Sequence, residues 1–254
     1  MSHSAAVCSI QANRIVGGEP TTIHRYPSIV QVEYRMTSGQ LSFWVQYCAG
    51  SIITSRYVVS AAHCFDGAFL PHSRRILAGT THRSIGGTAI IINKVIIHPS
   101  YGVAADFDAD ICVVQLLSSL TYSEVIAPVT VISAGFELPD GLPVQHAGWG
   151  TTSVRGPVSP VLRDVTIFTI NHELCAENYL SLSEDAVVTD NMICAGILNV
   201  GGKDACDNDS GGPLYYDDIL VGIISWGHGC GHETFPGVST AVSPYSDWIV
   251  DTAV

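Results

Sequence analysis

Charged residues are scarce in this sequence, and basic residues are scarcer than acidic ones. Only 13% of the 254 residues are charged, and 11 Lys and Arg residues stand against 23 Asp and Glu residues, for a formal net charge of −12. A surface that binds nucleic acid or an anionic membrane needs an excess of basic side chains. The sequence therefore predicts that neither is a partner of this protein.

Lysine is almost absent, since Lys94 and Lys203 are the two lysines beside nine arginines. Two interpretations stay open. One is drift in the amino-acid usage of the lineage. The other is selection in an alkaline medium, where an amine loses its charge and a guanidinium keeps it.

Long apolar runs are missing as well. The most apolar stretch, 89–97, contains Asn93 and Lys94 and is much shorter than the ~20 residues that a helix needs to span a bilayer. Disorder is excluded too, because 47% of the residues are hydrophobic and disordered chains combine low hydrophobicity with high charge. A chain of this length can bury a large core in one structural unit.

None of the eight cysteines belongs to a C-x-x-C pair, so zinc-ribbon and thioredoxin-type sites have no support. This many cysteines without a metal motif favours disulfides and an oxidising, extracellular compartment. Residues 5–10 look like the end of the apolar region of a signal peptide, and 10–12 is a passable cleavage context. We therefore expect a secreted protein in which residues 1–14 are a truncated signal plus propeptide.

Short runs rich in Val, Ile and Tyr alternate with turn residues along the chain. The runs expected to form strands are 28–34, 43–47, 57–61, 88–97, 111–116, 144–148, 165–170, 219–225 and 237–242. This pattern is typical of an antiparallel sandwich or barrel protein and not of βαβ units.

Two helices are expected beside these strands. Asn171 is placed to cap a helix over 172–179, and Ser243-Pro244 to open a terminal helix. In the second helix, the residues on one face would be Tyr245, Trp248 and Ile249.

Three separated segments contain the residue types of nucleophilic catalysis. Ser210 lies in the loop 207–212 between acidic residues and glycines, and His63 follows the apolar run 57–61. A serine hydroxyl becomes a nucleophile when a base takes its proton, a role that histidine can fill near neutral pH. A buried carboxylate orients that histidine, and the candidates for this role are Asp106, Asp108 and Asp110.

These motifs, in the order His, Asp, Ser, closely resemble those of the chymotrypsin/trypsin family of serine endopeptidases, its trypsin-like members in particular. The segment 14–18, Arg-Ile-Val-Gly-Gly, extends the resemblance over residues 15–254, the expected peptidase domain. The resemblance implies an all-β fold of two packed six-stranded antiparallel Greek-key β-barrels with a short C-terminal helix. It favours Asp110 as the third member of a triad with His63 and Ser210, because the core strand 111–116 follows Asp110 as in relatives.

The resemblance also assigns the groups that stabilise the oxyanion of the tetrahedral intermediate, the backbone N–H groups of Asn208 and Ser210. Relatives usually have glycine where this chain has Asn208. Asparagine tolerates a positive φ better than most residues, so we expect the loop to form. The departure puts full catalytic efficiency in doubt, and not the type of reaction.

Specificity for Arg or Lys is implied by Asp204, six residues before Ser210, which matches the acid at the base of the primary pocket in relatives. A buried carboxylate without a partner is costly, so a cationic side chain completes such a site. Further residues that match the pocket and the substrate-binding strand are Ser225, Trp226, Gly227 and Gly237.

Two neighbours, Asp207 at the lip of this pocket and Ser239 near its floor, depart from common trypsins. Asp207 should further favour basic substrates. A preference between Arg and Lys does not follow from the sequence.

A zymogen is implied by Arg14-Ile15, which resembles an activation cleavage site. In relatives the new α-ammonium group, here that of Ile15, pairs with the acid before the nucleophile, here Asp209. The pair would order the oxyanion loop, because Asp209 would otherwise be a buried unpaired charge.

The resemblance pairs the cysteines as Cys48–Cys64, Cys175–Cys194 and Cys206–Cys230. Cys8 is then expected to leave with the presequence, and Cys112 to be a small buried hydrophobe.

No metal and no cofactor are expected. Some relatives bind calcium in a loop of the first barrel, but this chain has no Asp or Glu from 67 through 105. His228 is a candidate for lining the substrate cleft. The histidines expected at the surface are His24, His72, His82, His98, His146, His172 and His232.

The sequence thus predicts a secreted, monomeric trypsin-like endopeptidase that cleaves after Arg or Lys, is activated by another protease and is bound by proteinaceous inhibitors. Digestion is the favoured role, because low lysine content resembles insect digestive trypsins. A non-digestive activating or reproductive-tract protease is the nearest alternative. A catalytically weak homologue that acts as a binding protein is the competing class, although the triad residue types are retained.

Overall fold

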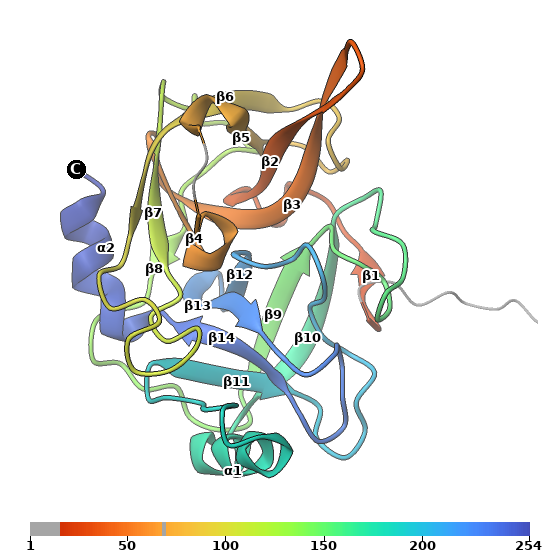
Figure 1. The fold of residues 1–254 in the computed structure, drawn as a ribbon, viewed down its shortest axis with the longest axis vertical. Coiled ribbons are helices and arrows are strands. Elements are labelled where there is room, and N and C mark those ends of the chain that lie inside the picture. The colour runs from red at the N-terminus through yellow and green to blue at the C-terminus, as the bar shows by residue number, and fades with distance from the viewer. Residues whose placement is uncertain (1–15, 68–69) are drawn as a thin grey trace, which may run out of the picture.

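The N-terminal half of the chain forms a closed β-barrel (Figure 1). The computed structural model describes residues 16–67 and 70–254. Within this part, β2 pairs with β5 and closes the strand order β2-β3-β4-β7-β6-β5. The six strands are β2 (Ile29–Ser38), β3 (Leu41–Thr54), β4 (Tyr57–Ser60), β5 (Arg74–Ala78), β6 (Thr88–Ile97) and β7 (Cys112–Leu116).

The C-terminal half forms a second closed barrel, in the order β10-β11-β14-β13-β12-β9. Its strands are β9 (Pro143–Gly148), β10 (Arg163–Ile170), β11 (Met192–Gly196), β12 (Pro213–Tyr216), β13 (Ile219–Trp226) and β14 (Gly237–Ala241). Two short strands add to it, β1 (Glu19–Pro20) beside β10 and β8 (Thr130–Val131) parallel to β13. Two closed six-stranded antiparallel barrels confirm the predicted fold class.

One hydrophobic core runs through both barrels. Strand β10 shows the alternation that builds this core, because Val165 and Ile167 are buried and Thr166 between them is exposed. Ile52 and Val114 of the first barrel and Ile223 of the second are fully buried members of the same cluster. Because the barrels share this core, loops at their junction are held by both.

Two α-helices flank the barrels within the described residues (Figure 1). Helix α1 (His172–Leu182) is capped by Asn171, whose side-chain oxygen accepts a hydrogen bond of 3.1 Å from the N–H of Leu174. Helix α2 (Ser246–Thr252) follows a 3₁₀ turn over 243–245 and buries Ile249. Both helices were expected, and α1 is one turn longer than the pattern indicated.

The sequence pattern did not predict strands β5, β11 and β12, nor the two-residue strands β1 and β8. β5 begins with Arg74 and Arg75, whose long side chains reach polar partners: Arg75 pairs with Glu33 at 2.5 Å. β12 begins with Pro213, directly after the glycines of the loop that carries Ser210. Burial in a barrel outweighs these unfavourable local signals.

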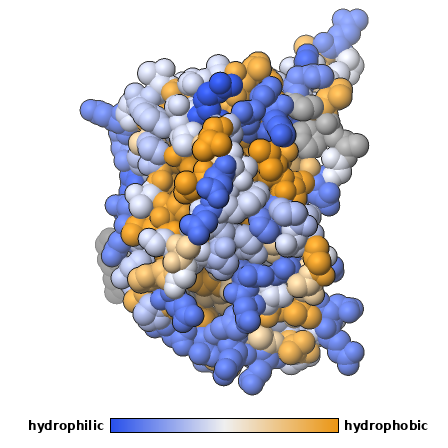
Figure 2. Space-filling view, turned by 90° about the vertical axis from the view of Figure 1, so that its left-hand side faces the viewer, coloured by the Kyte–Doolittle hydropathy of each residue, from blue (hydrophilic) through white to orange (hydrophobic). Residues whose placement is uncertain are grey.

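The hairpin of β2 and β3 extends beyond the expected strands and projects from the first barrel (Figure 1). Figure 2 shows another face, where hydrophobic patches are interspersed among hydrophilic residues. Among the described residues, no helix has the length and apolar character needed to cross a membrane.

Candidate active site

His63 lies at the end of the first barrel that faces the second. Strand β4 ends at Ser60, and a 3₁₀ turn over 62–64 then presents the imidazole, whose side chain is 24% exposed. The disulfide between Cys48 and Cys64 ties this turn to β3. The apolar strand and the disulfide therefore fix the histidine from both sides.

Asp110 is fully buried beside this imidazole. Its Oδ2 lies 2.7 Å from His63 Nδ1, and its Oδ1 accepts a hydrogen bond of 2.8 Å from the His63 backbone N–H. The two competing acids lie elsewhere: Asp106 is exposed, and buried Asp108 accepts hydrogen bonds from Thr189 and Asn191. Asp110 is thus the acid of the three that contacts His63.

The second barrel supports Asp110 through two hydroxyl groups. Ser225 Oγ donates to Asp110 Oδ2 at 2.5 Å, and Thr240 Oγ1 donates to the Asp110 carbonyl oxygen at 2.9 Å. With His63 on the other side, the carboxylate is held in one orientation. Nδ1 of His63 is the donor in this pair when the acid is ionised, which leaves Nε2 free to accept a proton.

Ser210 sits in a tight loop packed against the first barrel. Its carbonyl oxygen accepts a hydrogen bond of 2.8 Å from the N–H of Ala49. The N–H of the next residue, Gly211, donates a hydrogen bond of 2.8 Å to the Ile224 carbonyl oxygen. Gly211 has φ +77°, and a Cβ there would collide with Ser60, so only glycine fits. These contacts bring the serine loop against the strands that flank His63, but no hydrogen bond joins the Ser210 hydroxyl to His63 among the described residues.

The residues on either side of Asp209 in the sequence are Asn208 and Ser210, and their backbone N–H groups have no acceptor among the described residues. The N–H of Asp209, in contrast, donates a hydrogen bond of 2.9 Å to the Cys206 carbonyl oxygen. Asn208 has φ +74°, the conformation that asparagine was expected to tolerate. Two unpaired, fixed donors beside a serine can stabilise a developing oxyanion.

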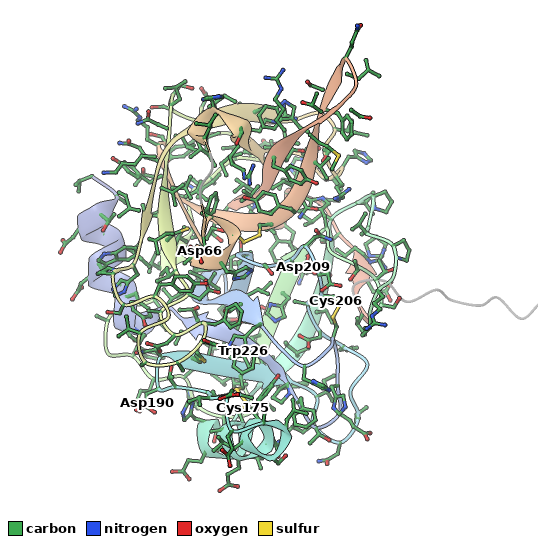
Figure 3. The ribbon with its side chains drawn as sticks, viewed as in Figure 1. Asp66, Cys175, Asp190, Cys206, Asp209 and Trp226 are labelled. Carbon is green, nitrogen blue, oxygen red and sulfur yellow. A yellow bond between two sulfur atoms is a disulfide. The ribbon has the colours of Figure 1, made fainter. Side chains whose placement is uncertain are left out.

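A cavity of about 340 Å³ opens beside Ser210. It is lined by every residue that the sequence assigned to substrate binding, namely Asp204, Ser225, Trp226, Gly227 and Gly237. Asp207 and Ser239 also line it. Figure 3 shows Trp226 in the middle of the molecule, next to the junction of the barrels.

Asp204 lines this cavity and is 4% exposed. Two backbone N–H groups, of Ala205 and Gly231, donate to its carboxylate, but burial outweighs them and raises its pKa to about 7. A Cβ on Gly237 would lie 2.6 Å from Asp204 Oδ1. Glycine at 237 therefore keeps the carboxylate open to the cavity.

Asp209 is buried even more completely, at 1% exposure, close to Cys206 at the junction of the barrels (Figure 3). Its carboxylate accepts hydrogen bonds from the N–H groups of Gly150 and Cys206, and burial raises its pKa to about 7. The Val16 carbonyl oxygen accepts 3.1 Å from the Asp204 N–H. Arg14 and Ile15 lie outside the described residues.

The prediction for His146 is wrong. This histidine was expected at the surface, but it is 3% exposed in β9 and lines the cavity of Asp204. Its Nδ1 donates to the Pro213 carbonyl oxygen at 3.4 Å, and burial lowers its pKa to about 4. The residue follows the alternation of its strand, which places position 146 inside the barrel.

His228 is exposed, and its ring packs against Phe235 and His232. It is not among the described residues that line the cavity. Of the other histidines expected at the surface, His98 and His172 are half-buried, and the remaining four are exposed.

The three disulfides implied by the resemblance are present, Cys48–Cys64, Cys175–Cys194 and Cys206–Cys230. Cys112 is a free, buried thiol in the first barrel, as expected. Cys8 lies outside the described residues.

Sequence reasoning missed the polar groups that support the site from behind. Ser225 was assigned to the substrate-binding strand, and its hydroxyl has a further contact, with Asp110, that the sequence did not indicate. Thr240 and Gln46, which donates 2.7 Å to the Asn208 carbonyl oxygen, carried no signal in the sequence. One amino-acid sequence contains no pattern that indicates a contact between a buried polar residue of one barrel and a loop of the other.

Comparisons with known proteins agree with this architecture. The family model described as Trypsin matches residues 15–249. "Trypsin, alkaline C" from Manduca sexta is 40% identical over 247 residues, 96% of this chain and 94% of the relative. "Trypsin CFT-1" from Choristoneura fumiferana is 37% identical, covering 97% and 93%, and "Trypsin" from Phaedon cochleariae is 34% identical, covering 98% and 93%.

The two barrels, the serine loop at their junction and the match to the family model together define the class of this protein, the serine endopeptidases. The chain belongs to the trypsin family, and its relatives include insect trypsins. The resemblance inferred from the motifs is confirmed.

Proposed function

We propose that this protein cleaves peptide bonds after Arg or Lys through an acyl-enzyme formed on Ser210. His63 takes the serine proton at Nε2 and returns it to the leaving amine, and Asp110 holds the imidazole and stabilises its charged form. The N–H groups of Asn208 and Ser210 receive the oxyanion. Water then attacks the acyl group. His63 takes a proton from this water and returns it to Ser210 Oγ as the carboxylic acid product leaves. The His63–Asp110 contact of 2.7 Å is the observation that carries this proposal.

Specificity rests on Asp204. A guanidinium or ammonium group entering the cavity would meet a carboxylate that accepts hydrogen bonds but forms no ion pair within the described part of the chain. Binding of the cation restores the ionised form that burial disfavours. Gly227 and Gly237 leave the walls open for a long side chain, and the exposed carboxylate of Asp207 at the cavity adds negative potential.

The enzyme would be made as a zymogen, with residues 1–14 removed from the peptidase domain 15–254 by an activating protease at Arg14-Ile15. The contact between Val16 and Asp204 supports this. Cys206, two residues beyond Asp204, donates to the Asp209 carboxylate, so the start of the described chain contacts the same segment that holds Asp209. An ammonium there would neutralise a carboxylate whose pKa burial raises.

Secretion and a digestive role fit the three disulfides and the insect relatives, three of which carry the word alkaline in their names. Those names favour selection in an alkaline medium as the cause of the low lysine content. Protein substrates and proteinaceous protease inhibitors are the partners that such a site fits, and the protein would act as a monomer. An activating or reproductive-tract protease would use the same chemistry in another setting.

The test is hydrolysis of matched Arg, Lys, Phe and Ala anilides by the secreted, cleaved chain. We expect turnover of the Arg and Lys substrates alone, loss of at least ~10³-fold in kcat in Ser210→Ala, and N-terminal sequencing that begins at Ile15. Asp204→Ser should remove the preference for basic residues while acylation by an activated ester persists. A folded, cleaved protein without turnover and without labelling of Ser210 by an organophosphonate would favour the binding-protein alternative.

A further inference from the structure

Gln46 of β3 is the one side chain from the first barrel that donates a hydrogen bond to the oxyanion loop in the described part of the chain. It is 1% exposed, and its amide nitrogen donates 2.7 Å to the Asn208 carbonyl oxygen and 3.1 Å to the Cys48 carbonyl oxygen. Both N–H bonds of the amide are therefore used.

Arg83 fixes the orientation of this amide. Its Nε donates a hydrogen bond of 2.7 Å to Gln46 Oε1, and its Nη2 donates one of 2.7 Å to the Gln46 backbone carbonyl oxygen. A guanidinium only donates, so the amide oxygen must face Arg83 and the amide nitrogen must face Asn208. Arg83 is itself anchored, since its N–H donates 3.0 Å to Pro160 in the second half of the chain.

The hydrogen bond from Gln46 acts on the residue whose N–H is a proposed oxyanion donor. On one side of Asn208, the N–H of Thr151 donates 2.8 Å to the Asp207 carbonyl oxygen and so sets the plane that carries the Asn208 N–H. On the other side, Gln46 sets the next peptide plane. With both planes held, the φ and ψ of Asn208 are fixed, although φ +74° is unfavourable for a residue with a side chain.

We propose that Gln46, held by Arg83, is a positioning residue that keeps the N–H of Asn208 aimed at the oxyanion. The inference rests on the proposed serine endopeptidase function and deepens it. It also explains how the loop keeps a working geometry with asparagine where relatives usually have glycine. Gln46 contacts neither the substrate cavity nor Asp204, so its loss should spare binding of the substrate side chain.

The test compares two isosteric substitutions in the cleaved enzyme. Gln46→Glu keeps an acceptor for Arg83 but loses both donors and places a carboxylate oxygen against the Asn208 carbonyl. Gln31→Glu is the matched control. Gln31 is fully buried on the adjacent strand β2, and its amide contacts His82 and Ser84 of the same loop as Arg83, but no contact joins it to Asn208 within the described residues.

Two inhibitors distinguish an effect on the oxyanion donors from an effect on the Asp204 cavity. Benzamidine occupies the cavity of Asp204 alone, whereas a peptidyl-arginine aldehyde forms a hemiacetal with Ser210 whose oxygen needs the oxyanion donors. For Gln46→Glu we expect the aldehyde Ki to rise and kcat for an Arg anilide to fall by about 10- to 100-fold, with benzamidine Ki changed less than about 2-fold. For Gln31→Glu we expect the ratio of the two Ki values to stay that of wild type.

An unchanged aldehyde Ki in Gln46→Glu, or an equal loss of benzamidine and aldehyde affinity, would overturn the proposal, because a general structural defect moves both inhibitors together. Binding of benzamidine reports that each variant is folded. Failure of the proposed function itself is a different result, since then the wild-type chain turns over no substrate and forms no aldehyde adduct.

Discussion

Three buried aspartates at this site have different partners, and the partners decide what each can do. Asp110 accepts hydrogen bonds from two groups of His63 and from the Ser225 hydroxyl, so its carboxylate is held against the imidazole in one orientation. Asp204 and Asp209 accept only from backbone N–H groups within the described residues, and burial raises the pKa of each to about 7. Each of these two carboxylates would be stabilised by a cation, and we propose the substrate side chain for Asp204 and the Ile15 ammonium group for Asp209.

At the residue scale, His146 should make the stability of the fold depend on pH. Burial lowers its pKa to about 4 from an ordinary value of 6.5, so the unfolded chain binds the proton first as the pH falls. The contribution to stability is intact above pH 6.5 and is lost between pH 6.5 and 4, by about 3 kcal/mol. His146→Gln, which does not titrate, should lack this loss.

The measurement is urea unfolding from pH 4 to 8 in a Ser210→Ala background, which prevents self-digestion. His24→Gln is the control, because His24 is exposed. The same pH slope in wild type and in His146→Gln would show that His146 titrates normally in the folded protein.

At the scale of the elements, disulfides join the segments that build the cavity. Cys206–Cys230 links the stretch after Asp204 to the loop after β13, and both of its cysteines line the cavity, whereas Cys175–Cys194 links α1 to β11 and neither of its cysteines lines it. The two bridges close loops of similar length, with sequence separations of 24 and 19 residues. Their effects on the unfolded chain should therefore be alike.

Replacing either pair by alanine should lower the free energy of unfolding by about 3 kcal/mol. Only the Cys206→Ala, Cys230→Ala variant should also weaken benzamidine binding and raise KM for Arg substrates, because it releases the wall of the Asp204 cavity. Denaturant titration and inhibition assays check both effects. Equal KM values in the two variants would show that the bridge does not shape the cavity.

At the scale of the whole molecule, the active site lies where two barrels meet. The first barrel supplies His63 and Asp110, and the second supplies the serine loop and the hydroxyls of Ser225 and Thr240 that hold Asp110. Val16, near the start of the described chain, contacts the backbone of Asp204 in the second barrel. A change at the N-terminal segment can thus reach the cavity and the oxyanion loop together.

Cleavage at Arg14-Ile15 should therefore switch on both binding and catalysis. We expect Arg14→Gln to be secreted folded, to resist activation and to bind benzamidine poorly. Asp209→Asn should be cleaved normally yet stay nearly inactive, because the new ammonium then lacks its carboxylate. N-terminal sequencing with parallel activity and benzamidine assays measures this, and full activity of the uncut Arg14→Gln chain would rule out the zymogen mechanism.

The sequence alone determined the fold class and the family. Alternating apolar runs, and the motifs around His63, Asp110 and Ser210, each consist of residues that are neighbours in the sequence and can be recognised there. It missed strands β1, β5, β8, β11 and β12. Arginines begin β5 and a proline begins β12, and these residues mask the alternation.

The tertiary structure places Asp110, the acid that the resemblance favoured, against His63, and it alone showed that His146 is buried and that Gln46 and Arg83 support the oxyanion loop. The physical reason is distance along the chain. Gln46 and Asn208 are 162 residues apart, and a hydrogen bond between such residues leaves no periodicity in the sequence. Closure of two barrels around one core brings them together.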